Sequence, residues 1–195
     1  MGTWGAARDT DGQEGVSHIG ANQSNVPIEM IEATYPIRIE SYGFVADSGG
    51  HGKQRGGLSI KREYRVLSDT ALLNVRSAKR DFPPHGLSGG SSGAPSMNRI
   101  VSGNSSRVIP VLLSEPIPLK QNDVFSHVMA SGGGYGDAFE RDGDAVLGDV
   151  VLGKVTIEGA KRDYGVVIKE THGGLSLDQD ATTKTRDEMR EVAPA

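Results

Sequence analysis

Apolar and polar residues alternate in several short segments of the chain, which is the pattern that predicts β-strands. The clearest case begins at Ile37, where the alternation continues as far as Phe44. Val and Ile together number 28 against 12 Leu, and β-branched side chains suit the pleated surface of a sheet. The predicted strands cover residues 37–44, 56–67, 70–78, 97–101, 107–113, 123–130 and 164–168.

Helical patterns are weaker and lie mainly toward the C-terminus. Residues 26–35 are expected to form one or two helical turns, with Pro27 in the first turn, where its missing N–H costs nothing. Residues 142–150 and 156–163 are expected to form short helices, and the hydroxyl of Thr156 is a suitable N-cap for the second.

Together these elements predict an α+β fold that is rich in strands, with Gly-rich loops and short helices near the C-terminus. Glycine occupies 27 of the 195 positions. Residues 1–25 carry few large apolar side chains, so we expect a Gly-rich arm that packs on a partner. Residues 26–170 are expected to form the main domain, and residues 171–195 a polar tail that is either a solvated helix or frayed. The fold would then be partial and completed by a partner subunit.

Composition and charge narrow the class of protein. The net charge is −4 and the isoelectric point is about 5.7, unlike the basic surface of a nucleic-acid-binding protein. No apolar run approaches the ~20 residues that cross a bilayer, and the N-terminus has no apolar leader. Cysteine is absent, which excludes disulfides and thiolate chemistry. We therefore expect a cytoplasmic protein that binds neither nucleic acid nor membrane.

Two Gly-rich loops match the sequence motifs of catalytic or phosphate-binding loops, but the sequence on either side does not have the features that those motifs require. Residues 86–90, and again 89–93, fit the G-x-S-x-G pattern of a nucleophilic serine, but no strand precedes and no helix follows. Residues 132–136 fit a phosphate loop weakly, because the carboxylates that follow would repel an anion. We favour a structural loop for the first and close backbone packing for the second.

Histidines and arginines are weak candidates by themselves. The histidines show no ligand spacing, so solvated loop histidines are favoured over a metal site. They are His18, His51, His85, His127 and His172. Several arginines stand near Gly-rich turns, where a guanidinium either forks onto a carboxylate or phosphate, or pins a loop to a backbone carbonyl. The second role is favoured. These arginines are Arg55, Arg76, Arg80 and Arg141.

Several motifs occur together in an order that resembles the hydantoinase B / oxoprolinase family. They are Asn25-x-Pro27-Ile28-Glu29, Asp47-Ser48-Gly49-Gly50-x-Gly52-x-x-Arg55-Gly56-Gly57, Pro83-Pro84-x-Gly86-Leu87-x-Gly89-Gly90-x-x-Gly93, Ser131-Gly132-Gly133-Gly134-Tyr135-Gly136-Asp137, Glu140-Arg141-Asp142, Val146-x-x-Asp149-Val150 and Tyr164-Gly165-Val166. The resemblance is to the C-terminal part of the family, and it covers nearly the whole chain.

The resemblance implies partners and cofactors outside this chain. A hydantoinase A-type subunit is expected to bind ATP, and a longer hydantoinase B-type N-terminal subunit to hold a divalent metal. No metal site is expected on this chain, because the family's acidic and histidine ligands have no counterpart here. The implied function is a subunit of an ATP-dependent complex that hydrolyses a cyclic amide such as a hydantoin, oxoproline or a lactam.

Other functions stay open at this point. A related branch of the family carboxylates ketones with ATP, so this chain could belong to a ketone carboxylase. It could also be a non-catalytic assembly subunit that only completes the fold, or a degenerate fragment without a partner.

The resemblance also implies which residues to examine. His18 could reach the metal region, and Arg55 and Arg80 could stabilise an anionic or phosphorylated intermediate. The Gly-rich loops are expected to line the substrate cavity or a subunit interface. Their residues are Asp47, Ser48, Gly49, Gly50, Gly56, Gly57, Gly89, Gly90, Gly132, Gly133 and Gly134.

Overall fold

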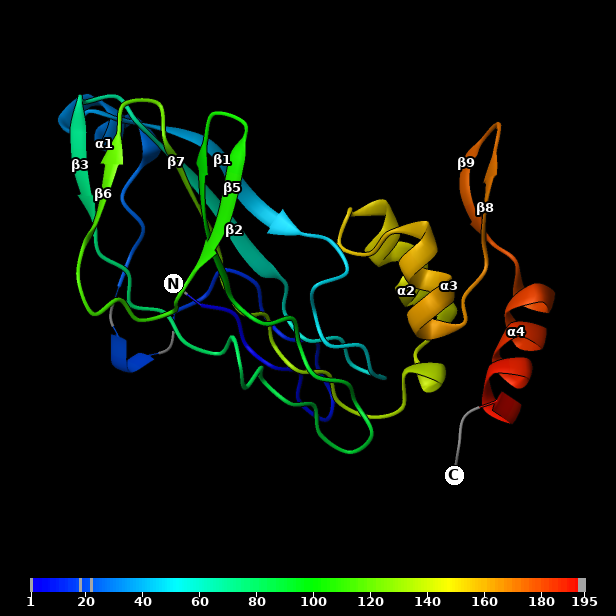
Figure 1. The fold of residues 1–195 in the computed structure, drawn as a ribbon. Helices are drawn as coiled ribbons and strands as arrows, with labels where there is room; N and C mark the ends of the chain where they lie inside the picture. Colours follow the sequence, from blue (N-terminus) through cyan, green and yellow to red (C-terminus); the bar gives the residue numbers. More distant parts are fainter. Residues whose placement is uncertain (1, 18, 22, 193–195) are drawn as a thin grey trace.

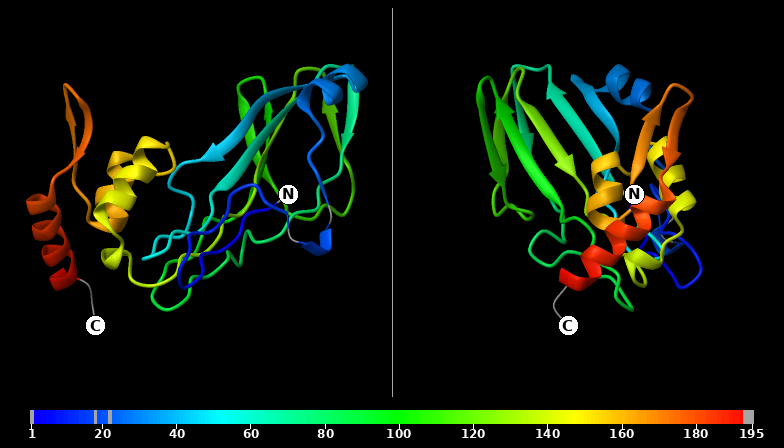
Figure 2. Two further views of the ribbon diagram at one scale, coloured as in Figure 1. Left: turned by 180° about the vertical axis from the view of Figure 1, so that it is seen from behind. Right: turned by 90° about the vertical axis from the view of Figure 1, so that its right-hand side faces the viewer.

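The computed structural model describes residues 2–17, 19–21 and 23–192. Figure 1 shows one lobe of strands and irregular loops, which extends to about residue 137, and a second lobe of helices and one hairpin. The view from behind in Figure 2 shows the same division. The predicted α+β fold, rich in strands and with short helices near the C-terminus, is confirmed. His18 lies outside the described residues.

Five strands form an antiparallel sheet in the order β1-β2-β7-β4-β5. They are β1 (Ile37–Val45), β2 (Ser59–Val66), β4 (Met97–Ser102), β5 (Ser105–Ile109) and β7 (Val124–Val128). Each overlaps a segment that alternation predicted. The predicted strand at 56–67 starts only at Ser59, because its two glycines belong to the loops below the sheet. The predicted strand at 107–113 leaves the sheet ahead of Pro110, which has no N–H for the ladder.

A second, two-stranded sheet lies over one end of the first. It pairs β3 (Thr70–Leu73) with β6 (Ile117–Lys120). β3 is shorter than the predicted strand at 70–78, and β6 has no counterpart in the sequence analysis. Pro118 lies within β6, and a two-stranded sheet tolerates proline because no third strand needs its N–H. The two sheets enclose one hydrophobic core, formed by Val66, Val75, Ile100, Ile109 and Leu119.

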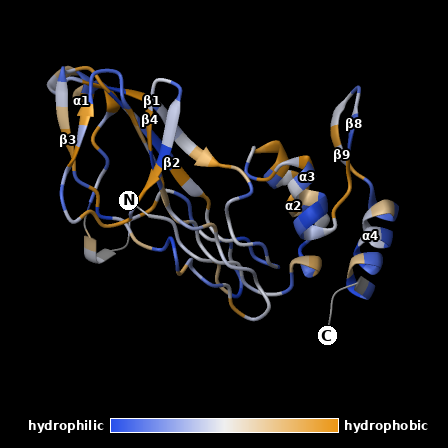
Figure 3. Cartoon of the chain, viewed as in Figure 1, coloured by the Kyte–Doolittle hydropathy of each residue, from blue (hydrophilic) through white to orange (hydrophobic). Residues whose placement is uncertain are grey.

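Below the sheet, four extended segments pack backbone against backbone. We call residues 4–13, 48–57, 84–94 and 131–136 the glycine layer; Figure 1 draws them as loops under the strands. Hydrogen bonds join them: the Gly50 N–H donates to the Gly132 carbonyl at 2.9 Å, and the Gly132 N–H to the Gly57 carbonyl at 2.8 Å. A Cβ at Gly56 would overlap the Gly132 carbonyl, so the approach requires glycine. In Figure 3 these loops are mostly white and blue, whereas the strands carry orange stretches.

The N-terminal arm runs inside this glycine layer. The Gly57 N–H donates to the Trp4 carbonyl at 3.0 Å, and the Gly12 N–H donates to the Arg55 carbonyl at 2.7 Å. The backbone of this arm is thus satisfied by loops of the same chain, which explains how a stretch with few apolar side chains is held. Packing of the arm on a partner subunit stays a prediction.

Short helices flank the sheet lobe, and η2 (Ala138–Glu140), α2 (Gly143–Val151) and α3 (Ile157–Tyr164) begin at residues whose side chains cap them. After η1 (Ile19–Ala21), α1 (Ile28–Thr34) confirms the predicted helical turns. η2, α2 and α3 follow the glycine layer. The Thr156 hydroxyl accepts a hydrogen bond from the Gly159 N–H at 2.9 Å, so the predicted cap is confirmed. Val146, Val155, Ala160 and Val166 are in the core of this second lobe.

The C-terminal region departs from the sequence analysis. The predicted strand at 164–168 is wrong, because Tyr164 ends α3 and Gly165, with φ 63°, turns the chain out of the helix. A hairpin of β8 (Ile168–Thr171) and β9 (Gly174–Leu177) follows, then α4 (Gln179–Val192). The predicted domain boundary at residue 170 falls inside β8. The predicted polar tail therefore contains β9 as well as the helix α4, and Thr182 within α4 is buried and accepts the Val167 N–H. No helix among the described residues is long and apolar enough to span a membrane.

Candidate functional site

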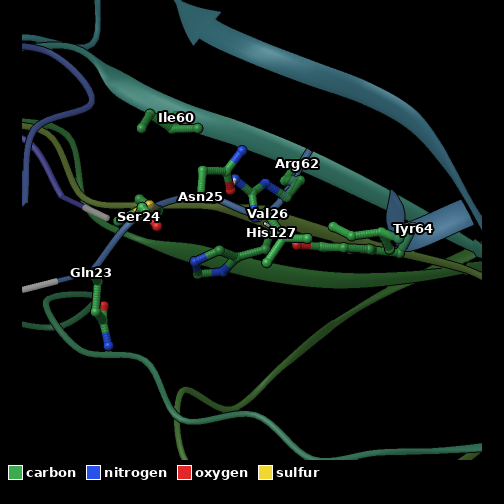
Figure 4. A pocket seen from close by; sticks show the side chains of 10 residues that line it. Gln23, Ser24, Asn25, Val26, Ile60, Arg62, Tyr64 and His127 are labelled. Atoms are coloured by element: carbon green, nitrogen blue, oxygen red, sulfur yellow. Dashed lines mark hydrogen bonds between the residues drawn. The ribbon is translucent and has the colours of Figure 1, made fainter. Parts of the chain in front are cut away.

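A small cavity lies between the segment 23–26 and the inner face of the five-stranded sheet. Its volume is about 290 Å³, and Figure 4 shows the side chains that line it. Ile60, Arg62 and Tyr64 come from β2, and His127 comes from β7. A second cavity of about 370 Å³ shares His127 and Met129 with the first. His127 is therefore the polar side chain at which the two cavities meet.

Strand register places three polar side chains in one row across the sheet. His127 on β7 pairs with Arg62 on β2 and with Asn98 on β4. Directly paired residues project from the same face of a sheet, so the three side chains are neighbours. Asn98 is fully buried in this row. The alternation that buries Ile100 on the same strand also buries Asn98, and burial of an amide requires hydrogen-bond partners.

Asn98 and His127 are joined by a hydrogen bond whose direction the neighbours fix. The Asn98 Nδ2 donates to the Pro110 carbonyl at 3.2 Å and to the Ser77 hydroxyl at 2.8 Å. A carbonyl can only accept, so the other amide atom, Oδ1, is the acceptor that faces His127 Nδ1 at 2.6 Å. The neutral imidazole therefore carries its proton on Nδ1, and Nε2 presents a lone pair.

Arg62 forms the opposite side of the row and is held in place by three residues. Its Nη2 donates to Asn25 Oδ1 at 2.7 Å, and its Nη1 donates to the Tyr64 hydroxyl at 3.3 Å. The guanidinium carbon lies 4.2 Å from the centre of the Tyr42 ring, which is a cation–π distance. In Figure 4 the Asn25 and Arg62 side chains meet beside the cavity. The cation is thus fixed next to His127.

The charges around the two cavities have one sign. Among the described residues, their linings include Arg62, Arg76 and Lys79 and no aspartate or glutamate. Burial lowers the pKa of His127 below its usual value, and the nearby Arg62 cation lowers it further. His127 is therefore neutral near pH 7 and acts as a hydrogen-bond acceptor beside a fixed cation.

A different group of charges lies buried where the glycine layer meets the helical lobe. We call Asp11, Glu14, Arg55, Arg141 and Asp149 the buried charge cluster. Arg141 binds both carboxylate oxygens of Asp11 at 2.7 Å and one oxygen of Asp149 at 2.8 Å. Arg55 lies 2.9 Å from a Glu14 oxygen and 3.3 Å from Asp149. The cluster therefore fastens the N-terminal arm and the helical lobe to the loop that carries Arg55.

The pKa values of this cluster follow its pairing. Burial alone would lower the pKa of the Arg141 and Arg55 guanidinium groups, but the facing carboxylates raise both. Burial raises and Arg141 lowers the pKa of Asp11, with a net fall. All three groups stay charged at neutral pH. The cluster holds the arm, the loop and the helical lobe together by ion pairs, although Arg141 Nε is buried without a hydrogen-bond partner.

The comparison with known proteins follows the same division of the molecule. Residues 1–138, which include the sheet and the glycine layer, match the family model described as hydantoinase B/oxoprolinase. The chain belongs to this family. The resemblance found in the sequence is confirmed.

The relatives of this hydantoinase B-type chain are much longer than it is. It is 38% identical over 83% of its length to an uncharacterized protein of Methanocaldococcus jannaschii, of which it covers 28%. It is 34% identical over 80% of its length to the beta subunit of the caprolactamase of Pseudomonas jessenii, covering 27% of it. A protein named as the B-type subunit of a D-/L-hydantoinase, from Pseudomonas sp. strain NS671, is 30% identical over 95% of this chain, with 31% of that protein covered. The chain spans less than a third of these relatives.

Solved structures show the same fold. The ATP-dependent caprolactamase of Pseudomonas jessenii matches with a TM-score of 0.80 and 29% identity, over 95% of this chain and 32% of that chain. Nucleotide-free acetone carboxylase matches with a TM-score of 0.78 and 21% identity, over 97% and 30% respectively. The second likeness shows a common fold only.

The catalytic candidates from the sequence fall in separate places. His18 is outside the described residues. Arg55 is 2% exposed in the buried charge cluster. Arg80 lies on the surface, where it contacts Asp81 at 3.2 Å and donates to the Ile109 carbonyl at 3.3 Å. Arg80 and Arg55 do pin backbone carbonyls, the role that was favoured, at Ile109 and Gly56 respectively. The disfavoured role is also present: Arg55 pairs with carboxylates, and Arg141 binds both oxygens of Asp11. A contact of either with substrate stays a prediction.

The loop residues singled out from the sequence belong to the glycine layer or its border. Asp47, with φ 59°, accepts the Thr156 N–H at 2.8 Å and so holds the start of α3. Ser48 accepts the Ser59 N–H at 2.8 Å. None of these loop residues lines the cavities at His127. They are Asp47, Ser48, Gly49, Gly50, Gly56, Gly57, Gly89, Gly90, Gly132, Gly133 and Gly134. Their place in a subunit interface stays a prediction.

The sequence analysis did not select Arg62, Asn98 and His127 as a site. Each occupies an alternate, inward position of a strand that it predicted correctly. A polar residue at an inward position is the signal that was available, but the pairing of three strands was not. Within residues 2–17, 19–21 and 23–192, no three His, Asp or Glu side chains come together as a metal site. The described residues alone do not fit the family's metal.

Proposed function

We propose that this chain forms part of the hydantoinase B-type subunit of a complex that hydrolyses a cyclic amide with ATP. The observation that carries the proposal is the likeness to caprolactamase, which extends over most of this chain in both sequence and structure. The likeness to acetone carboxylase is one of fold, so it favours no reaction.

The proposal assigns ATP and the metal to partners. This chain corresponds to less than a third of its relatives, and its described residues bring together no metal ligands. We propose that ATP binds to a hydantoinase A-type subunit, whereas the longer part of the hydantoinase B-type subunit holds a divalent cation. The contribution of this chain is then the cavity wall at His127 and the rigid glycine layer beneath it.

The chemistry explains why such a wall is useful. An amide carbonyl is a poor electrophile, and transfer of a phosphoryl group from ATP to its oxygen makes the carbon more reactive toward water. Charge then develops on oxygen atoms, and fixed cations stabilise such charge best where water is excluded. Arg62 supplies such a fixed cation here, and the described residues that line the two cavities include no aspartate or glutamate.

The test is to purify the chain with its companions from the native cell and to assay hydantoin, 5-oxoproline and caprolactam with ATP. We expect ring-opened acid and ADP to form together, and no acid without ATP. Incorporation of labelled bicarbonate into acetone, without ring opening of any amide, would instead establish a ketone carboxylase. Normal turnover by an assembly that lacks this chain would overturn the catalytic proposal.

A further inference from the structure

The cavity at His127 offers a hydrogen-bond acceptor next to a cation, and a cyclic amide offers the complementary pair. A small ring forces its amide to be cis, so the N–H and the C=O lie on one edge. We propose that His127 Nε2 accepts the ring N–H and that Arg62 donates to the ring carbonyl. His127 would then be the residue that selects cyclic amides over ketones, and the choice of ligand class rests on the proposed function.

The acceptor at Nε2 is built into the structure by a relay of hydrogen bonds. The Ser77 hydroxyl donates to the Val111 carbonyl at 3.3 Å and accepts from Asn98. Asn98 also donates from Nδ2 to the Pro110 carbonyl. If the amide flipped, Oδ1 would face that carbonyl oxygen, and two acceptors cannot form a hydrogen bond. The relay ends at His127 Nδ1, which must donate. Asn98 is therefore a positioning residue, because it acts on the ligand only through the tautomer of His127.

The surroundings keep this acceptor available. No residue in the described part of the chain makes a hydrogen bond to Nε2, whereas Nδ1 is engaged. The charged residues in the cavity linings are Arg62 on β2, which pairs with His127 across the sheet, and the exposed residues Arg76 and Lys79 on the segment after β3. Tyr64 is the other titratable group in the lining. Burial and the nearby Arg62 cation disfavour protonation of His127, and the same cation favours a carbonyl oxygen in the ligand.

The size and the apolar walls suit a small ring. The cavity of about 290 Å³ is at the lower end of ligand-binding cavities. Val26, Ile31, Ile60 and Met129 supply apolar surface around the polar pair. A ketone or a lactone has a carbonyl but no N–H. Such a ligand would cover the Nε2 lone pair without supplying a donor, and an acceptor that loses its water without gaining a partner costs binding.

The first experiment measures the tautomer in the full chain, without any partner or ligand. Nitrogen-15 side-chain NMR at pH 7.5 distinguishes a protonated Nδ1 from a protonated Nε2. We expect His127 to be neutral with its proton on Nδ1. A proton on Nε2 of His127 would overturn the proposal. This outcome is independent of whether the complex hydrolyses amides.

The second experiment measures binding of 2-pyrrolidinone and N-methyl-2-pyrrolidinone to the same labelled chain. We expect 2-pyrrolidinone to shift the Nε2 resonance of His127 and to bind about tenfold to a hundredfold more tightly than the N-methyl compound. γ-Butyrolactone and acetone should bind as weakly as the N-methyl compound. Equal affinity for all four probes would overturn the proposal.

Variants assign the effect to the relay. His127→Phe keeps an aromatic ring but removes the acceptor, so selectivity for 2-pyrrolidinone should disappear. Ser77→Ala removes one outer partner of Asn98, and we expect the population with a proton on Nε2 to increase. His85→Gln is the matched control and should change neither result. If a variant fails to fold, the measurements on the unaltered chain still decide.

Selective binding in a complex without amidase activity would refute the proposed function alone, whereas amidase activity without this selectivity would refute only the role of His127.

Discussion

The five-stranded sheet and the glycine layer lie next to each other but exclude water in different ways. In the sheet, side chains such as Ile100 and Ile109 fill the space between strands and their cover. In the glycine layer the backbones themselves meet, and hydrogen bonds such as Gly50 to Gly132 hold them. A sheet can exchange one side chain for another at modest cost, but a backbone contact has no room for any side chain. Side chains of the sheet can therefore be exchanged with little effect on the fold, whereas residues at the backbone contacts of the glycine layer cannot.

This difference also separates the two groups of arginines. Arg62 stands on the sheet, beside a cavity, with His127 as a neighbour. Arg55 and Arg141 stand where the glycine layer meets the helices, and carboxylates of the same chain bind them. The same side chain thus serves recognition in one region and fastening in the other. Substitutions in the two regions should differ in size and in kind.

The largest effect is expected from a methyl group in the glycine layer. A Cβ at Gly56 would overlap the carbonyl of Gly132 and lie 2.8 Å from the Gly133 oxygen. We expect Gly56→Ala to destabilise the fold by more than about 4 kcal/mol, or to prevent folding. The measurement is urea unfolding followed by circular dichroism. Gly43→Ala in β1 is the control, because nothing lies within 4 Å of its Cβ, and it should change stability by less than about 0.5 kcal/mol. Equal stability of the two variants would refute the account of the layer.

The next largest effect is expected from the buried charge cluster. Asp149→Asn keeps the shape of the side chain but removes the charge that faces Arg55 and Arg141. We expect a loss of about 3 kcal/mol in the free energy of unfolding, because buried guanidinium groups lose a carboxylate. The exposed pair Lys184–Glu188 supplies the control: Glu188→Gln should cost less than about 0.5 kcal/mol. A small loss for Asp149→Asn would mean that the cluster does not fasten the two lobes.

The sequence predicted the sheet better than the rest of the fold, and the reason is physical. Alternation reports one buried face, so β1, β2, β4, β5 and β7 were all found. β6 was missed because Pro118 argues against a strand, and only the edge position makes it acceptable. The strand expected at 164–168 was wrong because the apolar residues there pack on helices rather than on a sheet. The spacing of apolar residues along the chain cannot by itself tell a segment that packs on helices from one that packs in a sheet.

The candidate site was predictable only in part. The glycine motifs identified the family, because close backbone contacts leave a mark in the sequence as glycine. They did not identify the cavity, since the glycines pack against each other and none of them lines it. The row of Arg62, His127 and Asn98 depends on strand order, which joins residues up to 65 positions apart along the chain. Such a row cannot be found from spacing in one sequence.

A smaller effect is expected from pH and tests the inner face of the sheet. Burial lowers the pKa of His127 and of His51 below the ordinary value of 6.5. Below pH 6.5 the unfolded chain therefore binds protons that the folded chain does not, and stability falls as the pH falls. The slope is at most about 1.4 kcal/mol per pH unit for one proton. Thermal unfolding between pH 8 and pH 5 measures it. His127→Gln should flatten the slope, and an unchanged slope in this variant would contradict the neutral state of His127.

The smallest effect has the opposite sign and completes the contrast with Gly56. Gly148 lies inside α2, it has no φ in the left-handed region, and a Cβ there would meet nothing within 4 Å. Alanine loses less backbone entropy than glycine when a helix forms. We expect Gly148→Ala to stabilise the chain by about 0.5 to 1 kcal/mol, measured as a small rise in the midpoint of thermal unfolding. Destabilisation by this variant would show that the added methyl group meets other atoms at Gly148, as it would in the glycine layer, and would contradict the open position described here.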